Sequence, residues 1–302
     1  MTLRHRVLEF ARERWIGFCV IAVILVAWEI AGHLSPKSLL SQSPIVPPWE
    51  FVFGHSFLGM SDYWTLDFLA PAPMLGGEKT YLGAVLAICY HSALTLMRLV
   101  LGLVFGTVGG VLLGLAFSWS SFLRRLASTP LHILRMFPLL AMVPLFQFWF
   151  GANTKGAVTF IAYGVGVVYF ATTINAVSNI PNKYVEYART LGASRMRIYR
   201  SIVLPAIMPE LGASVILTLG LAWSTVIGAE YIGLDSGIGR VLIFAQFFSN
   251  TGRMTLITLL IILYATISYA LFHRVASRIL RWMPSSAFAD AAVVRTAKRD
   301  DQ

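Results

Sequence analysis

Long apolar stretches limit what this chain can fold into more than any other feature of its sequence. A helix that crosses the hydrocarbon core of a membrane needs about 20 consecutive apolar residues. Six such stretches occur, and charged residues lie between them instead of alternating along them. The stretches are Trp15 to Leu34, Leu94 to Phe117, Leu131 to Phe150, Ala157 to Val177, Leu211 to Ala229 and Thr255 to Phe272. We therefore predict an all-α integral membrane protein with six transmembrane helices.

Composition argues against a soluble protein. Of the 302 residues, 57% are hydrophobic and 13% are charged, and the charged share is about half that of a soluble domain. The net charge of +10 is also typical of nucleic-acid-binding proteins, but here the basic residues fall in four separate segments. Cys19 and Cys89 lie far apart in apolar stretches, without metal-ligand or redox spacing. We expect both to be small buried apolar residues.

The placement of Lys and Arg predicts the orientation in the membrane. If the N-terminus is cytoplasmic, 17 of the 24 Lys and Arg residues face the cytoplasm and 5 face outward. The other two, Arg98 and Arg135, lie within or at the edge of a span. Basic residues favour the cytoplasmic side, so we predict a multi-pass protein of the cell (inner) membrane with both termini in the cytoplasm.

Three regions follow from this pattern. Residues 1–80 hold the first span and a Pro-rich outer loop, which is either a spacer or a docking site. Residues 81–283 form a core, and residues 284–302 are polar, charged and predicted to be disordered. Tyr81 to Tyr90 is interpreted as an interfacial helix leading into the second span, with a seventh span as the alternative.

Several residues inside the spans are candidates for packing or for the transport path. Glycines recur every four residues in the second span and predict either close helix packing or a pore-lining face; they are Gly102, Gly106, Gly110 and Gly114. Prolines that kink or break a helix punctuate the third span; they are Pro130, Pro138 and Pro144. We expect Glu29 and Arg98 to reach the outer interface, whereas Glu230 is either an interfacial carboxylate or a structural or gating group. The candidate path or gating residues are Pro138, Pro144, Gln147, Trp223, Ser224 and Glu230.

The cytoplasmic segment between the fourth and fifth spans, residues 181–205, is the most informative. Pro181 suits the first turn of a short helix, and Gly192 can adopt the left-handed conformation that ends it. Ser194 can cap a second helix, and Pro205 is expected to break the chain before the fifth span. This pattern predicts a helix–turn–helix that fits a cleft in a cytosolic partner, or else an amphipathic helix resting on lipid headgroups.

The same segment resembles the signature of ATP-driven (ABC) importer permeases, which reads E-A-A, three residues, G, nine residues, I, one residue, L-P. The matching residues are Glu186, Tyr187, Ala188, Gly192, Ile202, Leu204 and Pro205, with Tyr187 in place of the first alanine. The stretches HSALTLMRLVLGLVFG, FPLLAMVPLFQFWFG and WSTVIGAEYIGLDSGIG are similar to the nitrate/sulfonate/taurine branch of that family. The resemblance implies a type I importer permease fold in which this segment is the coupling helix.

The resemblance also implies the partners. These are a second permease copy held through the glycine-rich second span or the fifth, two cytoplasmic ATPase subunits, an extracytoplasmic solute-binding protein and membrane lipid, but no nucleic acid. No phosphate-binding loop of the G-x-x-x-x-G-K-[ST] type occurs in the sequence, so ATP is expected to bind to the partner ATPase and this chain needs no cofactor. The predicted function is a permease for a small organic or inorganic anion, such as a sulfonate, taurine or nitrate, and not an enzyme. The alternative is an ion-coupled secondary transporter, although the sequence lacks the internal symmetry typical of that class.

Overall fold

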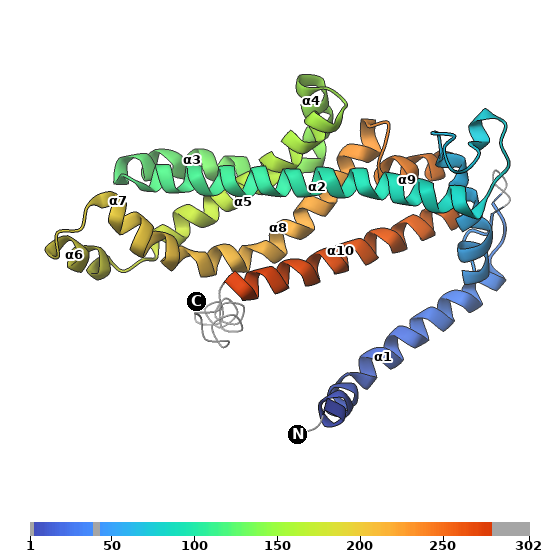
Figure 1. The fold of residues 1–302 in the computed structure, drawn as a ribbon, viewed down its shortest axis with the longest axis horizontal. Helices are drawn as coiled ribbons and strands as arrows, with labels where there is room; N and C mark the ends of the chain where they lie inside the picture. The colour runs from blue at the N-terminus through green and yellow to red at the C-terminus, as the bar shows by residue number, and fades with distance from the viewer. Residues whose placement is uncertain (1–2, 39–42, 280–302) are drawn as a thin grey trace. The chain divides into compact units, whose positions relative to one another are not determined.

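The computed structural model describes residues 3–38 and 43–279, where regular structure is helical apart from an isolated bridge between Lys37 and Pro44. The α-helices are α1 Leu3–Leu34, α2 Tyr81–Ser118, α3 Ser121–Met136, α4 Leu139–Phe150, α5 Thr154–Ser178, α6 Asn182–Thr190, α7 Arg195–Ile198, α8 Leu204–Gly233, α9 Ile238–Phe247 and α10 Thr251–Ile279 (Figure 1). The shorter turns are η1 Phe51–Ser56, η2 Gly59–Tyr63, η3 Pro73–Leu75 and η4 Tyr199–Val203. The predicted disordered tail, residues 284–302, lies outside the described residues.

The number of apolar helices agrees with the prediction of about six spans. Within residues 3–38 and 43–279, five helices are long and apolar enough to cross a membrane, and the bent pair α3–α4 is a sixth candidate. Residues 81–90, however, are neither a separate interfacial helix nor a seventh span, because they form the first turns of α2. No proline lies between Tyr81 and Ser118, so nothing interrupts the hydrogen-bond ladder of this 38-residue helix.

The third predicted span is broken. Helices α3 and α4 meet at an angle of 99°, and Pro138 lies at the junction as the N-cap of α4. Phe137 has ψ 127°, since a residue that precedes proline avoids the helical region. Pro130 and Pro144 lie inside α3 and α4 without ending either helix. Only one of the three prolines therefore breaks the helix.

The chain divides into two compact units, of which the first contains residues up to His91 together with Val241–Ile261. Its Pro-rich loop is more ordered than predicted, because it contains η1 to η3. Two contacts fasten the loop to the start of α10: Arg253 donates to Asp62 at 2.5 Å, and the Thr251 hydroxyl donates to the Pro44 carbonyl. The prediction that Cys19 and Cys89 are buried is wrong, since both lie on helix faces that the rest of this chain leaves uncovered.

The second unit contains Ser92–Arg240 and the residues from Ile262 onward. Within it, α5 packs along α8, and α4 contacts both of them. The core cluster that joins these three helices contains Val143, Phe146, Ala157, Phe160, Ala229 and Leu234. Burial of these side chains fixes α4 on the α5–α8 pair.

The glycine stripe of α2 packs against α5, as one of the two interpretations predicted. A Cβ on Gly110 would lie 2.5 Å from the Gly166 carbonyl oxygen, and one on Gly106 would lie 2.7 Å from Val165 Cβ. Only glycine permits this approach of the two helices. Since α5 of the same chain occupies the stripe, the stripe is not free for the predicted contact with a second permease copy.

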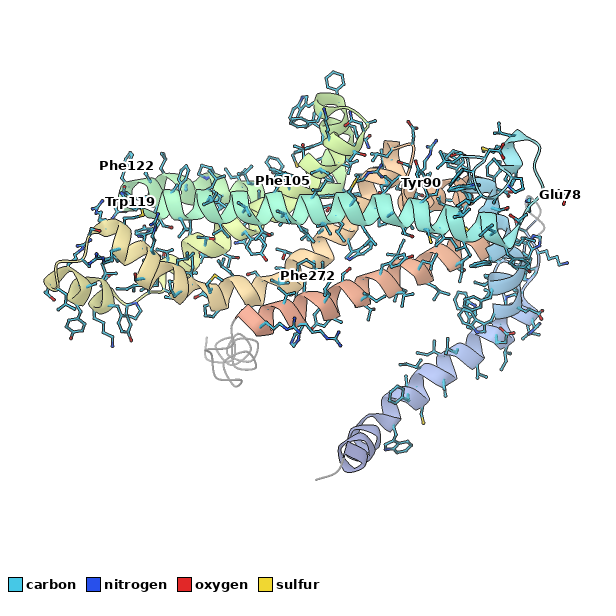
Figure 2. The ribbon with its side chains drawn as sticks, in the orientation of Figure 1. Glu78, Tyr90, Phe105, Trp119, Phe122 and Phe272 are labelled. Carbon is cyan, nitrogen blue, oxygen red and sulfur yellow. The ribbon has the colours of Figure 1, made fainter. Side chains whose placement is uncertain are left out.

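Large apolar side chains also lie on the outside of the helices. Phe105 on α2 is 61% exposed and Phe122 on α3 is 73% exposed (Figure 2). In water such a surface would favour aggregation, whereas in a bilayer the lipid tails cover it. The exposed faces therefore agree with a membrane location.

Candidate functional site

The segment between α5 and α8 forms the predicted helix–turn–helix. Gly192 has φ +77°. Its N–H donates to the Arg189 carbonyl at 2.9 Å, and the N–H of Ala193 donates to the Ala188 carbonyl at 3.0 Å, which is the Schellman pattern that ends a helix. The Ser194 hydroxyl then accepts from the N–H of Arg197 and caps α7. The predicted roles of Gly192 and Ser194 in the turn are thus confirmed.

One end of this segment is anchored and the other is exposed. The ring of Tyr199 lies 4.7 Å from that of Trp119 at the end of α2, and the Arg195 guanidinium lies over the Trp119 ring. By contrast, α6 contains no buried residue; of its signature residues, Glu186 and Tyr187 are exposed and Ala188 is half-buried. The signature residues of α6 are therefore available to a partner.

Pro205 does not break the chain, contrary to prediction. Helix α7 continues through η4, which is a π-helical turn, directly into α8, so Arg195–Gly233 is one apolar helical run of 39 residues. Pro205 follows this π-helical turn directly, and the irregular hydrogen bonding of such a turn accommodates a residue that has no N–H. Pro181 likewise precedes α6 as its N-cap and does not lie in its first turn.

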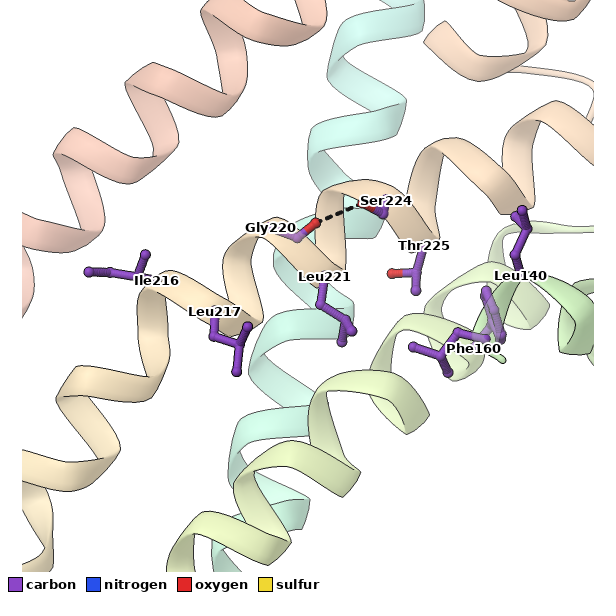
Figure 3. A pocket seen from close by; sticks show the side chains of 9 residues that line it. Leu140, Phe160, Ile216, Leu217, Gly220, Leu221, Ser224 and Thr225 are labelled. Carbon is purple, nitrogen blue, oxygen red and sulfur yellow. Dashed lines mark hydrogen bonds between the residues drawn. The ribbon is translucent and has the colours of Figure 1, made fainter. Parts of the chain in front are cut away.

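A hollow of about 670 Å³ lies on α8 beside α4 and α5 (Figure 3). It is lined by Leu139, Leu140, Phe160, Ile216, Leu217, Gly220, Leu221, Ser224 and Thr225. Ser224 is the one candidate path residue in this lining, and its hydroxyl donates to the Gly220 carbonyl at 3.0 Å. No charged residue is among the described residues that line it.

The other candidate path residues occupy different surroundings. Pro138 and Pro144 are exposed on the α3–α4 junction and on α4. The Gln147 amide donates to the Ala229 carbonyl at 3.1 Å and thereby holds α4 on α8. Trp223 and Glu230 are buried inside the second unit.

Glu230 forms a buried ion pair with Arg98. The two side chains are 0% and 3% exposed, and Arg98 Nη1 donates to Glu230 Oε1 at 2.7 Å. Thr95 Oγ1 lies within 2.9 Å of both carboxylate oxygens, and the N–H of Gly239 donates to Oε2 at 3.0 Å. The expectation that Arg98 reaches the outer interface is therefore wrong, and Glu230 is a buried partner of Arg98 and not an interfacial carboxylate.

The ion pair fixes the loop that follows α8. Arg98 also donates to the Ser236 carbonyl and hydroxyl at 2.7 Å and to the Thr154 hydroxyl at 3.2 Å. Gly237 has φ +111°, and a Cβ there would overlap the Glu230 carboxylate. The pair thus joins α2, the start of α5, α8 and this loop. Two opposite charges in separate spans were the signal for it, because charges at membrane depth are usually paired.

Comparison with known proteins identifies the family. Residues 106–281 match the model of the binding-protein-dependent transport system inner membrane component. The chain belongs to this family. It is therefore the permease subunit of an ABC importer and a transport component, not an enzyme or an ion-coupled carrier.

Individual relatives agree with this assignment. The permease is 32% identical over 279 residues to a protein of Escherichia coli (strain K12) named as an aliphatic sulfonates transport permease, SsuC, covering 89% of this chain and 92% of that protein. It is 25% identical to the protein of that name from Bacillus subtilis (strain 168), covering 91% and 90% of the two chains. It is also 25% identical to the taurine transport system permease TauC of Escherichia coli (strain K12), covering 76% and 75%.

Solved structures show the same fold. One is a bacterial ABC transporter involved in import of the acidic polysaccharide alginate, with a TM-score of 0.54 at 13% identity, covering 91% of this permease and 99% of that chain. Another is a methionine ABC transporter in an inward-facing conformation, with a TM-score of 0.52 at 22% identity, covering 62% and 92%. At these identities the likeness concerns the importer permease fold alone.

Proposed function

We propose that this permease imports small organic sulfonate anions. The observation that carries the proposal is the 32% identity to an aliphatic sulfonates permease over nearly the whole length of both proteins. The apolar hollow supports it, because alkyl groups favour a lining of Leu, Ile and Phe side chains. The path includes the hollow and three exposed residues, Pro138, Pro144 and Ser224. The residues that hold the surrounding helices in place are Gln147, Trp223 and Glu230.

The working complex contains two copies of this permease, two cytoplasmic ATPase subunits and an extracytoplasmic binding protein. Both termini of the permease lie in the cytoplasm, as the excess of Lys and Arg on that side supports. The exposed α6 and its turn at Gly192 form the coupling segment. The small side chain of Ala188 suits a close contact inside a cleft of the ATPase.

Transport follows from alternating access. The binding protein delivers the solute from outside, and ATP binding draws the ATPase subunits together. The coupling segments must bind differently in the two states of the ATPase, since a ligand shifts an equilibrium only through such a difference. Helix α8 carries this motion to the hollow.

Uptake by the reconstituted complex tests the proposal. The tagged permease is purified in mild detergent with its ATPase, reconstituted into proteoliposomes and supplied with its binding protein. We expect ATP-dependent uptake of radiolabelled ethanesulfonate that vanadate stops and a proton or sodium ionophore does not. Uptake of other solutes but no sulfonate would refute the proposed solute class, and insensitivity to vanadate would refute the proposed coupling to an ATPase.

A further inference from the structure

We propose that Arg135 is the anion-binding residue of the path, where its guanidinium binds the sulfonate group while the hollow takes the organic part of the solute. This inference rests on the proposed function and goes further by naming the group that recognises the charge. Arg135 lies in the last turn of α3, four residues before Leu139, the first residue that lines the hollow. A chain of that length spans at most about 14 Å.

Arg135 differs from Arg98, Glu210 and Glu230, the other charged residues deep in the helices of the second unit. Its side chain is exposed, and it forms no hydrogen bond or ion pair with any residue that the structure describes. Arg98 and Glu230, by contrast, neutralise each other in the interior, and Glu210 accepts from Asn179. An unpaired charge at membrane depth is costly and calls for a partner outside the chain.

Packing places Arg135 level with the middle of α5, because α3 starts beside the end of α5, where Arg124 donates to the Ser178 hydroxyl at 3.3 Å. Helix α3 lies along α5, where Ala127 and Leu131 contact Ala171 and Ile174. That cluster occupies the half of α5 that ends at Ser178, and Arg135 lies one turn, about 6 Å, beyond Leu131. The 25-residue α5 is about 37 Å long, so Arg135 lies level with its central part.

The described spans of the second unit hold no carboxylate that could neutralise this charge from a second permease copy. Among the described residues, the carboxylates within the spans of the second unit are Glu230, which is buried, and Glu210, whose partner Asn179 lies at the end of α5. The described part of the second unit in an identical copy therefore presents no free carboxylate at the level of Arg135. Lipid tails solvate a guanidinium poorly. We therefore expect Arg135 to face an aqueous path, where an anion can neutralise its charge.

The chemistry fits a sulfonate. The planar guanidinium has five N–H donors and binds tetrahedral oxyanions in a bidentate manner. The hollow supplies no charge of its own, so a solute with an anionic head and an apolar tail matches the two features together. In a complex with two permease copies, two such cations would face the path.

Thiol labelling tests whether position 135 faces water, independently of the solute. Arg135→Cys is introduced together with Cys19→Ser and Cys89→Ser, because both native cysteines are exposed. The reagent is the hydrophilic, impermeant 2-sulfonatoethyl methanethiosulfonate, and Ile133→Cys on the same helix is the control for an exposed apolar face. We expect Arg135→Cys to react at least tenfold faster. Equal or slower labelling would overturn the inference.

Uptake by charge variants tests the anion-binding role. We expect Arg135→Gln to reduce ethanesulfonate uptake at least tenfold and Arg135→Lys to retain most of it, with both variants still binding the ATPase. Arg278→Gln, at the end of α10, removes an equal charge outside the candidate spans and should transport like the parent. If the parent transports sulfonate and Arg135→Gln does so equally well, the inference is wrong and the proposed function stands. If the parent transports no sulfonate, the solute proposal fails and the anion-binding role falls with it, while the labelling result still decides whether Arg135 lines the path.

Discussion

Replacing Glu230 by glutamine should destabilise the permease severely, because every group around the carboxylate is a donor. Arg98 and Thr95 reach Oε1, whereas Thr95 and the N–H of Gly239 reach Oε2. A glutamine side chain has one oxygen and one NH2 group, so the NH2 must face either the Arg98 guanidinium or the N–H of Gly239. Either orientation sets a donor against a donor in a buried site.

The loss of charge adds to this conflict. Two unit charges about 4 Å apart interact by about 4 kcal/mol at an effective dielectric constant of about 20. Arg98 keeps its bonds to Ser236 and Thr154, but its charge is left without a counter-ion at 2% exposure of the residue. Breaking a buried pair in this way costs about 3 to 5 kcal/mol. We expect a loss of that size for Glu230→Gln.

Denaturant-induced unfolding in detergent micelles, followed by tryptophan fluorescence, measures the loss. Glu210→Gln is the matched control, because Glu210 is an exposed carboxylate on the same helix, and its change should stay within about 0.5 kcal/mol. The double variant Arg98→Met with Glu230→Gln should be less destabilised than the sum of the single variants by at least about 2 kcal/mol. If Glu230→Gln lowers the free energy of unfolding by less than about 1 kcal/mol, the ion pair does not have the stabilising role argued here. The same holds if the losses of the two single variants add up to the loss of the double variant.

Three further predictions concern the packing of α2 on α5, the proposed coupling segment and the orientation in the membrane. Gly110→Ala should reduce stability and yield because its Cβ would meet the Gly166 carbonyl at 2.5 Å, whereas Gly109→Ala, with no atom within 4 Å, should not; equal thermal stabilities would contradict the packing argument. Ala188→Glu should insert in the membrane but lose the ATPase in co-purification, because the charge would be unpaired in the cleft. Gly192→Val should also lose the ATPase, because valine at this positive φ strains the backbone by about 1 to 2 kcal/mol. Gly192→Asn should keep the ATPase, because asparagine tolerates positive φ. If both Ala188→Glu and Gly192→Val keep the ATPase, the segment is instead a helix that rests on lipid headgroups. Ser194→Cys should react with an impermeant thiol reagent only after the cells are opened, and labelling in intact cells would reverse the predicted orientation.

Sequence patterns predicted the features that depend on local chemistry. Hydropathy located the spans because each needs a long run of apolar residues whatever its neighbours are. The turn at Gly192 and the cap at Ser194 were predictable because both depend on backbone conformation and short-range hydrogen bonds. The glycine stripe of α2 likewise indicated close packing, although its partner helix could not be read from the spacing.

Features that depend on tertiary contacts were missed. The pairing of Arg98 with Glu230 joins residues far apart in the chain, and each alone fits an interfacial position equally well. The prolines show the same limit, since Pro130 and Pro205 lie inside continuous helices whereas Pro138 lies at a break, and the residue type alone does not predict that difference. Pro138 breaks the helix where Phe137 adopts an extended conformation, whereas Pro205 follows the π-helical turn η4 inside a continuous helical run.

The continuity of α7, η4 and α8 has a consequence for coupling. The run Arg195–Gly233 contains 39 residues and is therefore about 58 Å long. It begins next to the proposed coupling segment and includes Ser224, which lines the hollow. If the ATPase displaces the helix at Arg195, the movement is transmitted along one continuous helix to Ser224 in the proposed path. It does not have to pass through a series of side-chain contacts. The π-helical turn at residues 199–203 is the weak point of that helix, because such turns distort the regular hydrogen bonding. We therefore expect bending between the two states to concentrate there, while the buried ion pair beyond Ser224 holds the far end of α8 in place.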